Sequence, residues 1–145
     1  MLIKNIRHLG LVVTDMEKAL KFYHELLGLK IQGETEEEGL FIDTLLKQKN
    51  SKLKTIKLSS EDNATRLELI SYENKLPSYN KKQLDQSGLT HISLTVHNLD
   101  ETYSILKERG IEFNCPPTLS VNQNLKVTFC RDFEGNFLEL TEEIP

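Results

Sequence analysis

The chain of 145 residues is 38% hydrophobic and 28% charged, with a formal net charge of −4. This length and composition are typical of one globular domain, which we expect to span residues 1–145. The acidic balance disfavours nucleic acids and anionic membranes as partners, because both require a concentrated basic surface. No apolar run approaches the roughly 20 residues that cross a bilayer, and no signal peptide precedes the first strand-like segment. We therefore expect a cytoplasmic protein with no membrane and no nucleic-acid partner.

The first half of the chain shows the side-chain periodicities of several strands and one amphipathic helix. Thr14 and Asp15 can cap the start of this helix, and Gly28 is a natural residue at its end. The predicted elements, in the order strand, helix and three strands, are residues 6–13, 16–27, 29–33, 54–58 and 66–72.

The same order of elements returns in the second half, at residues 90–96, 100–109 (the helix), 111–113, 126–131 and 137–141. The repetition extends to individual residues, because His8 aligns with His91, and Glu68 aligns with Glu139 between two leucines in each copy. The chain is therefore an internal duplication, with one module at about 1–75, a linker at about 76–87 and a second module at about 88–145. Two copies are too few for a solenoid and predict a pair of modules in one domain.

The first copy is the longer one, and its extra residues fall within 34–52. Residues 41–46 have the pattern of a short helix. We expect this helix to cover the site or the edge of a sheet.

Each copy places a histidine at the start of its first strand and a glutamate within its last strand. The alternation of a strand puts His8 and His91 on the face opposite to their apolar neighbours. Glu68 and Glu139 take the same polar face, although carboxylates within apolar strands are rarely buried unless paired or bound to a metal. If a pseudo-twofold axis relates the copies, the four residues converge. They would then neutralise a divalent cation and leave coordination positions open.

Each of these residues also has a simpler interpretation. A single histidine at the start of a strand is commonly a surface residue or a hydrogen-bonded core residue. Glu68 could pair with Arg66 or Lys57 on a solvent-facing strand, and Glu139 could be a polar residue of an edge strand. The four residues occupy equivalent positions in the two copies of the repeat, which favours a metal site over these separate interpretations.

Other catalytic motifs are missing from the sequence, which has no glycine-rich phosphate loop and no nucleophile elbow. Cys115 and Cys130 lack the spacing of a zinc or redox motif, and we expect two buried or half-buried thiols. Cys130 lies in a predicted strand beside the cationic Arg131, and we expect it to have a structural role. His24 and His97 have no counterpart in the other copy, so we expect them at the surface.

Residues 8–29, HLGLVVTDMEKALKFYHELLGL, resemble the opening strand and helix of the vicinal-oxygen-chelate superfamily. Residues 131–140 resemble its closing DPDGN-x-x-E-L turn and strand, with Phe133 where proline is usual. This superfamily includes glyoxalase I, methylmalonyl-CoA epimerase, extradiol dioxygenases and antibiotic-resistance proteins. The resemblance covers nearly the whole chain. It implies an α+β fold in which two paired βαβββ modules form an open, curled mixed sheet around a central metal site.

The resemblance implies that His8, Glu68, His91 and Glu139 are the metal ligands, a set most similar to that of glyoxalase I. Methylmalonyl-CoA epimerases commonly have glutamine at the position of Glu68. The resemblance thus implies a divalent metal ion (Zn, Ni, Co, Mn or Fe) and a glyoxalase-like isomerase, epimerase or lyase. Its substrate would be a small carbonyl compound with vicinal oxygens that reacts through an enolate or enediolate. Glu139, or Glu68 released from the metal, would be the catalytic base.

Two alternatives stay open within the same fold. An iron(II)-dependent dioxygenase would need only His8, His91 and Glu139, and a metal-free protein would bind a small molecule such as an antibiotic. Either way the expected partner is a small molecule, which lysine or arginine side chains could hold by a carboxylate or phosphate. The sequence shows no basic set suited to glutathione. We also expect a homodimer, with the site inside one chain or shared across a swapped dimer.

Overall fold

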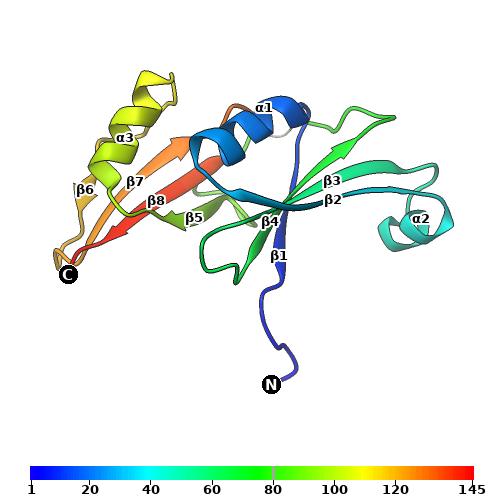
Figure 1. The fold of residues 1–145 in the computed structure, drawn as a ribbon, viewed down its shortest axis with the longest axis horizontal. Helices are drawn as coiled ribbons and strands as arrows, with labels where there is room; N and C mark the ends of the chain where they lie inside the picture. Colours follow the sequence, from blue (N-terminus) through cyan, green and yellow to red (C-terminus); the bar gives the residue numbers. More distant parts are fainter. Residues whose placement is uncertain (80) are drawn as a thin grey trace. The chain divides into compact units, whose positions relative to one another are not determined.

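The computed structural model describes residues 1–79 and 81–145. The chain divides into two compact units, Met1–Tyr79 and Asn80–Pro145. Each unit contains one four-stranded mixed sheet. The strands and helices of both units are labelled in Figure 1. The predicted α+β fold with two βαβββ modules is therefore confirmed.

The first unit has a sheet with the strand order β1-β4-β3-β2, in which β1 is parallel to β4 and the other neighbours are antiparallel. The short helix predicted in the longer copy is present as α2, which Figure 1 shows at the far end of β2 and β3. The elements are β1 (His8–Val12), α1 (Met16–Leu20), η1 (Lys21–Leu26), β2 (Lys30–Glu38), α2 (Leu40–Leu46), β3 (Lys52–Ser59) and β4 (Arg66–Tyr72).

The first predicted helix forms over almost its full expected length, but only its first half is α-helical. Asp15 caps its start, because its carboxylate accepts a hydrogen bond of 3.0 Å from the backbone N–H of Lys18. The second half, η1, is π-helical, and the N–H of Leu27 reaches the carbonyl of Phe22, five residues back. Gly28 follows with φ of 79°, a backbone conformation that favours glycine.

The core of the first unit lies between the helix and one face of the sheet. α1 contacts β4, and the Phe22 and Tyr23 rings of η1 are buried with an edge-to-face contact of 4.9 Å between centroids. Full burial of one such apolar side chain contributes about 1.5 to 3 kcal/mol to folding. The buried strand residues of this core include Ile56, Leu58, Leu67 and Leu69.

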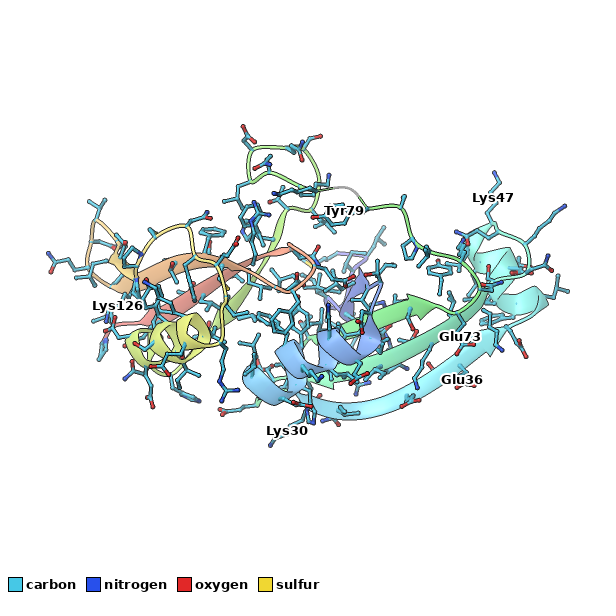
Figure 2. The ribbon with its side chains drawn as sticks, turned by 90° about the horizontal axis from the view of Figure 1, so that it is seen from above. Lys30, Glu36, Lys47, Glu73, Tyr79 and Lys126 are labelled. Atoms are coloured by element: carbon cyan, nitrogen blue, oxygen red, sulfur yellow. The ribbon has the colours of Figure 1, made fainter. Side chains whose placement is uncertain are left out.

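β2 is the edge strand of the first sheet and is strongly charged. It extends to Glu38, beyond the end of the predicted strand at 29–33. Figure 2 shows two of its charged side chains, Lys30 and Glu36. Glu36 is paired in register with Lys54 of β3, and Lys54 Nζ lies 2.5 Å from Glu34 Oε1. Charged side chains of this kind protect an edge strand from pairing with another chain.

The second unit repeats this topology with the strand order β5-β8-β7-β6, in which β5 is parallel to β8. Its helix begins after Asn98, whose side chain accepts a hydrogen bond from the N–H of Glu101. Within residues 1–79 and 81–145, no helix is long and apolar enough to cross a membrane. The elements are β5 (His91–Thr95), α3 (Leu99–Glu108), β6 (Thr118–Leu119), β7 (Leu125–Arg131) and β8 (Phe137–Glu143).

The strand predicted at 111–113 does not form, which corrects one element of the second module. Only an isolated bridge joins Phe113 to Cys130, and the ladder with β7 resumes at β6, which was not predicted. Pro116 and Pro117 lie between these two points. Because proline has no backbone N–H to donate, the pair interrupts the strand.

Candidate metal-binding site

In the first unit, His8 and Glu68 lie on the same face of the sheet. Gly10 of β1 is directly opposite Glu68 in the parallel register, and His8 shares the face of Gly10 because it lies two residues earlier. His8 Nδ1 is 3.5 Å from Glu68 Oε1, and the side chain of Glu68 is only 15% exposed. The structure thus brings the first predicted His and Glu together.

The second unit contains the equivalent pair. Ser93 of β5 is opposite Glu139 of β8, and His91 precedes Ser93 by two residues. His91 Nε2 lies 3.9 Å from Glu139 Oε2. Both predicted His–Glu pairs are therefore formed locally, each within its own unit.

Two hydroxyl groups orient the carboxylate of Glu139. Ser93 Oγ donates to Glu139 Oε1 at 2.9 Å, and Thr141 Oγ1 donates to the same oxygen at 3.3 Å. The other oxygen, Oε2, is the one that faces His91. His91 is itself positioned by Thr90, whose Oγ1 lies 3.0 Å from Nδ1 of the imidazole ring. Sequence reasoning missed these hydroxyls, although Ser93 and Thr141 each lie two residues from a predicted ligand.

Glu68 has no such hydroxyls at the corresponding positions of the first unit. Gly10 replaces Ser93, and Ile70 replaces Thr141. The two carboxylates therefore differ, because Glu139 accepts hydrogen bonds from its own sheet, whereas Glu68 accepts none from the residues that the structure describes.

The third strand of each sheet places a different side chain beside the carboxylate. Lys57 of β3 is opposite Glu68, whereas Phe129 of β7 is opposite Glu139. The Phe129 ring meets the imidazole of His91 edge to face, with 5.2 Å between ring centroids. Within the described residues, Lys57 forms no ion pair with Glu68. The suggested salt bridge between these two residues is thus not formed.

The remaining histidines and cysteines lie outside the two pairs. His24 and His97 are exposed, as expected, and His24 Nδ1 lies 2.7 Å from the carbonyl oxygen of Leu29. Both cysteines are free thiols, and burial raises the pKa of Cys130 to about 12, which disfavours its reactive thiolate form. Cys115 is exposed, which corrects the expectation of a buried or half-buried thiol, because it lies in the irregular segment before β6.

The donor groups of each pair suit a divalent metal ion. Within residues 1–79 and 81–145, no group of three or more His, Cys, Asp or Glu side chains is placed to hold a metal. The four predicted ligands instead form two pairs, with 3.5 Å and 3.9 Å between imidazole nitrogen and carboxylate oxygen. Two atoms that each lie about 2.1 Å from a shared zinc ion are about 3 to 3.5 Å apart. The His8–Glu68 separation of 3.5 Å lies at the upper end of this range, and the His91–Glu139 separation of 3.9 Å is slightly longer, so the second pair would have to close by a few tenths of an ångström around a metal ion. The hydroxyls on Glu139 resemble the outer partners that orient metal ligands.

Comparisons with known proteins agree with this architecture. The uncharacterized protein YwkD of Bacillus subtilis (strain 168) is 31% identical over 146 residues, which cover 99% of this chain and 100% of that protein. A glyoxalase family protein from Bacillus cereus has a similar structure, with a TM-score of 0.90, 20% identity and coverage of 99% of this chain and 96% of that chain. The trypanothione-dependent glyoxalase I of Leishmania major shares the fold, with a TM-score of 0.66, 20% identity and coverage of 97% and 88%.

The family comparison covers the elements that carry both His–Glu pairs. Residues 5–140 match the family model described as Glyoxalase/Bleomycin resistance protein/Dioxygenase superfamily. This range begins before β1 and ends within β8, so that it includes every predicted ligand. The chain belongs to the Glyoxalase/Bleomycin resistance protein/Dioxygenase superfamily.

Proposed function

We propose that the protein is a divalent-metal-dependent isomerase, epimerase or lyase that acts on a small carbonyl substrate with vicinal oxygens. The observation that carries this proposal is the matched placement of His8 beside Glu68 and of His91 beside Glu139. In the proposal these four residues are the metal ligands, supplied by one chain or by two chains of a homodimer. Two carboxylates balance the charge of a divalent cation, and two neutral imidazoles complete a set suited to Zn, Ni, Co, Mn or Fe.

The proposed chemistry is a proton transfer by a carboxylate of the chain. A bound divalent cation supplies the Lewis-acid charge that favours loss of an α-proton from a carbonyl compound. Glu68 or Glu139 accepts this proton and returns it to the neighbouring carbon or to the opposite face. The hydroxyls of Ser93 and Thr141 hold Glu139 in place, which favours Glu139 as the fixed ligand and Glu68 as the base.

Two other functions are supported by single observations. Glu139, the better oriented carboxylate, is also the one that an iron(II) dioxygenase would use together with His8 and His91. A metal-free binding protein is compatible with the lack of any three-ligand group among the described residues. Both classes are named in the description of the superfamily, as dioxygenase and as bleomycin resistance protein.

Elemental analysis of protein purified without added metal tests whether the chain is a metalloprotein. We expect close to one divalent metal ion per site, and large losses in His91→Ala and Glu139→Ala. His97→Ala is the matched control, because His97 is exposed and lies outside both pairs. A metal content near zero in the unmodified protein would contradict the proposal and favour the binding protein.

Isotope exchange then separates the two reaction classes. An isomerase, epimerase or lyase of the proposed kind exchanges the α-proton of its substrate with solvent, so incubation of small keto acids in deuterium oxide should place deuterium at the α-carbon. Glu68→Gln should abolish this exchange if Glu68 is the base. Oxygen uptake without exchange would instead support the dioxygenase.

A further inference from the structure

Lys57 lies in a row of paired residues that crosses the first sheet from β2 to β1. In the register of the strands, Gly33 of β2 is opposite Lys57, Lys57 is opposite Glu68, and Glu68 is opposite Gly10. Residues that lie opposite one another project from the same face, so Lys57 and Glu68 are neighbours between two glycines. A Cβ atom built at Gly33 would meet no heavy atom within 4 Å. The space beside Lys57 is therefore open on the side of β2.

Lys57 differs from the other lysines of its strand, because it has no counter-ion among the described residues. Lys52 Nζ lies 3.3 Å from Glu73 Oε2, and Lys54 Nζ lies 2.5 Å from Glu34 Oε1. Lys57 is half-buried and forms no ion pair within residues 1–79 and 81–145. Its positive charge is therefore available to an anionic ligand.

The strand around Lys57 is polar on the same face. Thr55 and Ser59 flank it at two-residue spacing, and both are almost fully buried, with 6% and 2% of their surface exposed. The side chain of Gln32 donates a hydrogen bond of 2.8 Å to Ser59 Oγ. These buried hydroxyl groups make the surroundings of Lys57 polar, and Lys57 is the most exposed residue among the three.

The lysine is not required by the fold. The second unit has the same topology and the same His–Glu arrangement, but it places Phe129 at the position of Lys57. Ile56 and Leu58 project from the opposite face of β3 and pack in the apolar core of the first unit, to which Lys57 does not contribute. The charge is therefore specific to one half of the duplicated site.

We infer that Lys57 binds a carboxylate group of the substrate, next to the His8–Glu68 pair. This inference rests on the proposed function and extends it to a substrate class, namely small carboxylic acids with a second oxygen on the adjacent carbon. Opposite residues in a sheet have Cβ atoms about 5 Å apart, so a molecule of a few carbon atoms can reach both the ammonium group and the metal ligands. Lys57 is a specificity-determining residue in this scheme, and the proton transfer remains with the carboxylates.

Oxalate, which carries two adjacent carboxylates, is a suitable probe for this pair of contacts. We would load the full-length protein with Ni²⁺ and titrate it with oxalate by calorimetry, for the unmodified chain and for Lys57→Gln. The variant should bind oxalate about tenfold more weakly, because one charge-assisted contact is lost. It should bind Ni²⁺ several-fold more tightly, because the repulsion between the ammonium group and the cation is removed.

Lys54→Gln is the matched control, since Lys54 lies on the same strand but on the opposite face. Its affinities for Ni²⁺ and oxalate should stay within twofold of the unmodified protein, and Lys57→Arg should retain most of the oxalate affinity. Equal oxalate affinities in Lys57→Gln and Lys54→Gln would overturn the role of Lys57 and leave the metal proposal standing. Loss of both affinities in Lys57→Gln would also overturn it, because a structural role predicts that result. Failure of the unmodified protein to bind Ni²⁺ would overturn the proposed function and this inference with it.

Discussion

The hydroxyl of Ser93 donates a 2.9 Å hydrogen bond to Oε1 of Glu139. At the equivalent point of the first unit, Gly10 lies opposite Glu68 and has no side chain to donate. The duplicated halves therefore keep the same pair of donor groups but surround their carboxylates differently. A carboxylate that is held by hydrogen bonds loses little freedom when it binds a cation, whereas an unrestrained one can leave and return more easily.

Replacement of Ser93 by alanine should weaken metal binding. The change removes the shorter of the two hydrogen bonds that orient Glu139, and loss of an outer partner of this kind typically costs about 10- to 100-fold in metal affinity. Calorimetric titration with Ni²⁺ measures the effect, for which we expect about a tenfold rise in Kd.

The matched change in the first unit is Gly10→Ser. A Cβ atom at Gly10 would lie 3.4 Å from Cδ1 of Ile70, the flexible end of a side chain, so the substitution should be tolerated. It would supply a hydroxyl beside Glu68, and we expect equal or tighter Ni²⁺ binding. Unchanged affinity in Ser93→Ala, or equal losses in both variants, would show that the hydroxyl does not orient a ligand.

The core of the first unit should depend strongly on Leu58. Its side chain is fully buried in β3, so Leu58→Ala should lower the free energy of unfolding by about 2 to 5 kcal/mol. Leu45 of α2 is 64% exposed, and Leu45→Ala should change it by less than about 0.5 kcal/mol. Urea unfolding followed by far-UV circular dichroism measures both. Similar losses in the two variants would mean that α2 is covered in solution.

The carboxylate of Asp43 should stabilise the turn that follows α2 when it is ionised. Its carboxylate accepts hydrogen bonds from the backbone N–H groups of Asn50 at 2.9 Å and Ser51 at 2.7 Å. The bond from Ser51 is the main reason that the pKa of Asp43 lies below its ordinary value. Because the folded-state pKa is lowered, the stabilisation is present above the ordinary aspartate pKa and is lost as the pH falls through the lowered value.

An NMR titration tests this prediction directly. The amide proton shifts of Asn50 and Ser51 should change together at a pH below the ordinary aspartate range, and Asp43→Asn should remove the change. A midpoint at or above the ordinary value would contradict the assignment of these hydrogen bonds.

The two thiols should react at very different rates. Cys115 is exposed, whereas Cys130 is buried, which raises its pKa to about 12 and leaves almost no thiolate at pH 8. Iodoacetamide at pH 8 should therefore alkylate one cysteine per folded chain, and peptide mass spectrometry should identify it as Cys115. Cys130 should react only after denaturation. Rapid modification of Cys130 in the folded protein would show that the second unit opens easily.

The elements that were predicted well from the sequence are those whose signal is local. The strands that carry His8, Glu68, His91 and Glu139 appear at nearly the expected positions, because alternation of apolar and polar residues reports directly on a half-buried strand. The prediction failed at 111–113, where the residues look like a strand but the prolines that follow prevent continuous pairing. The π-helical turn of η1 likewise has no recognisable local pattern.

By itself, the sequence determined that the chain is duplicated and that each copy has a His and a Glu on the polar face of its sheet. Tertiary structure decided how these residues are surrounded: hydroxyls hold Glu139, glycine and isoleucine accompany Glu68, and Lys57 stands beside it. The physical reason is that strand register joins residues far apart in the chain. Hydrogen bonding between β1 and β4 places His8 Nδ1 3.5 Å from Glu68 Oε1. This alignment of two distant segments cannot be read from any short stretch of the sequence.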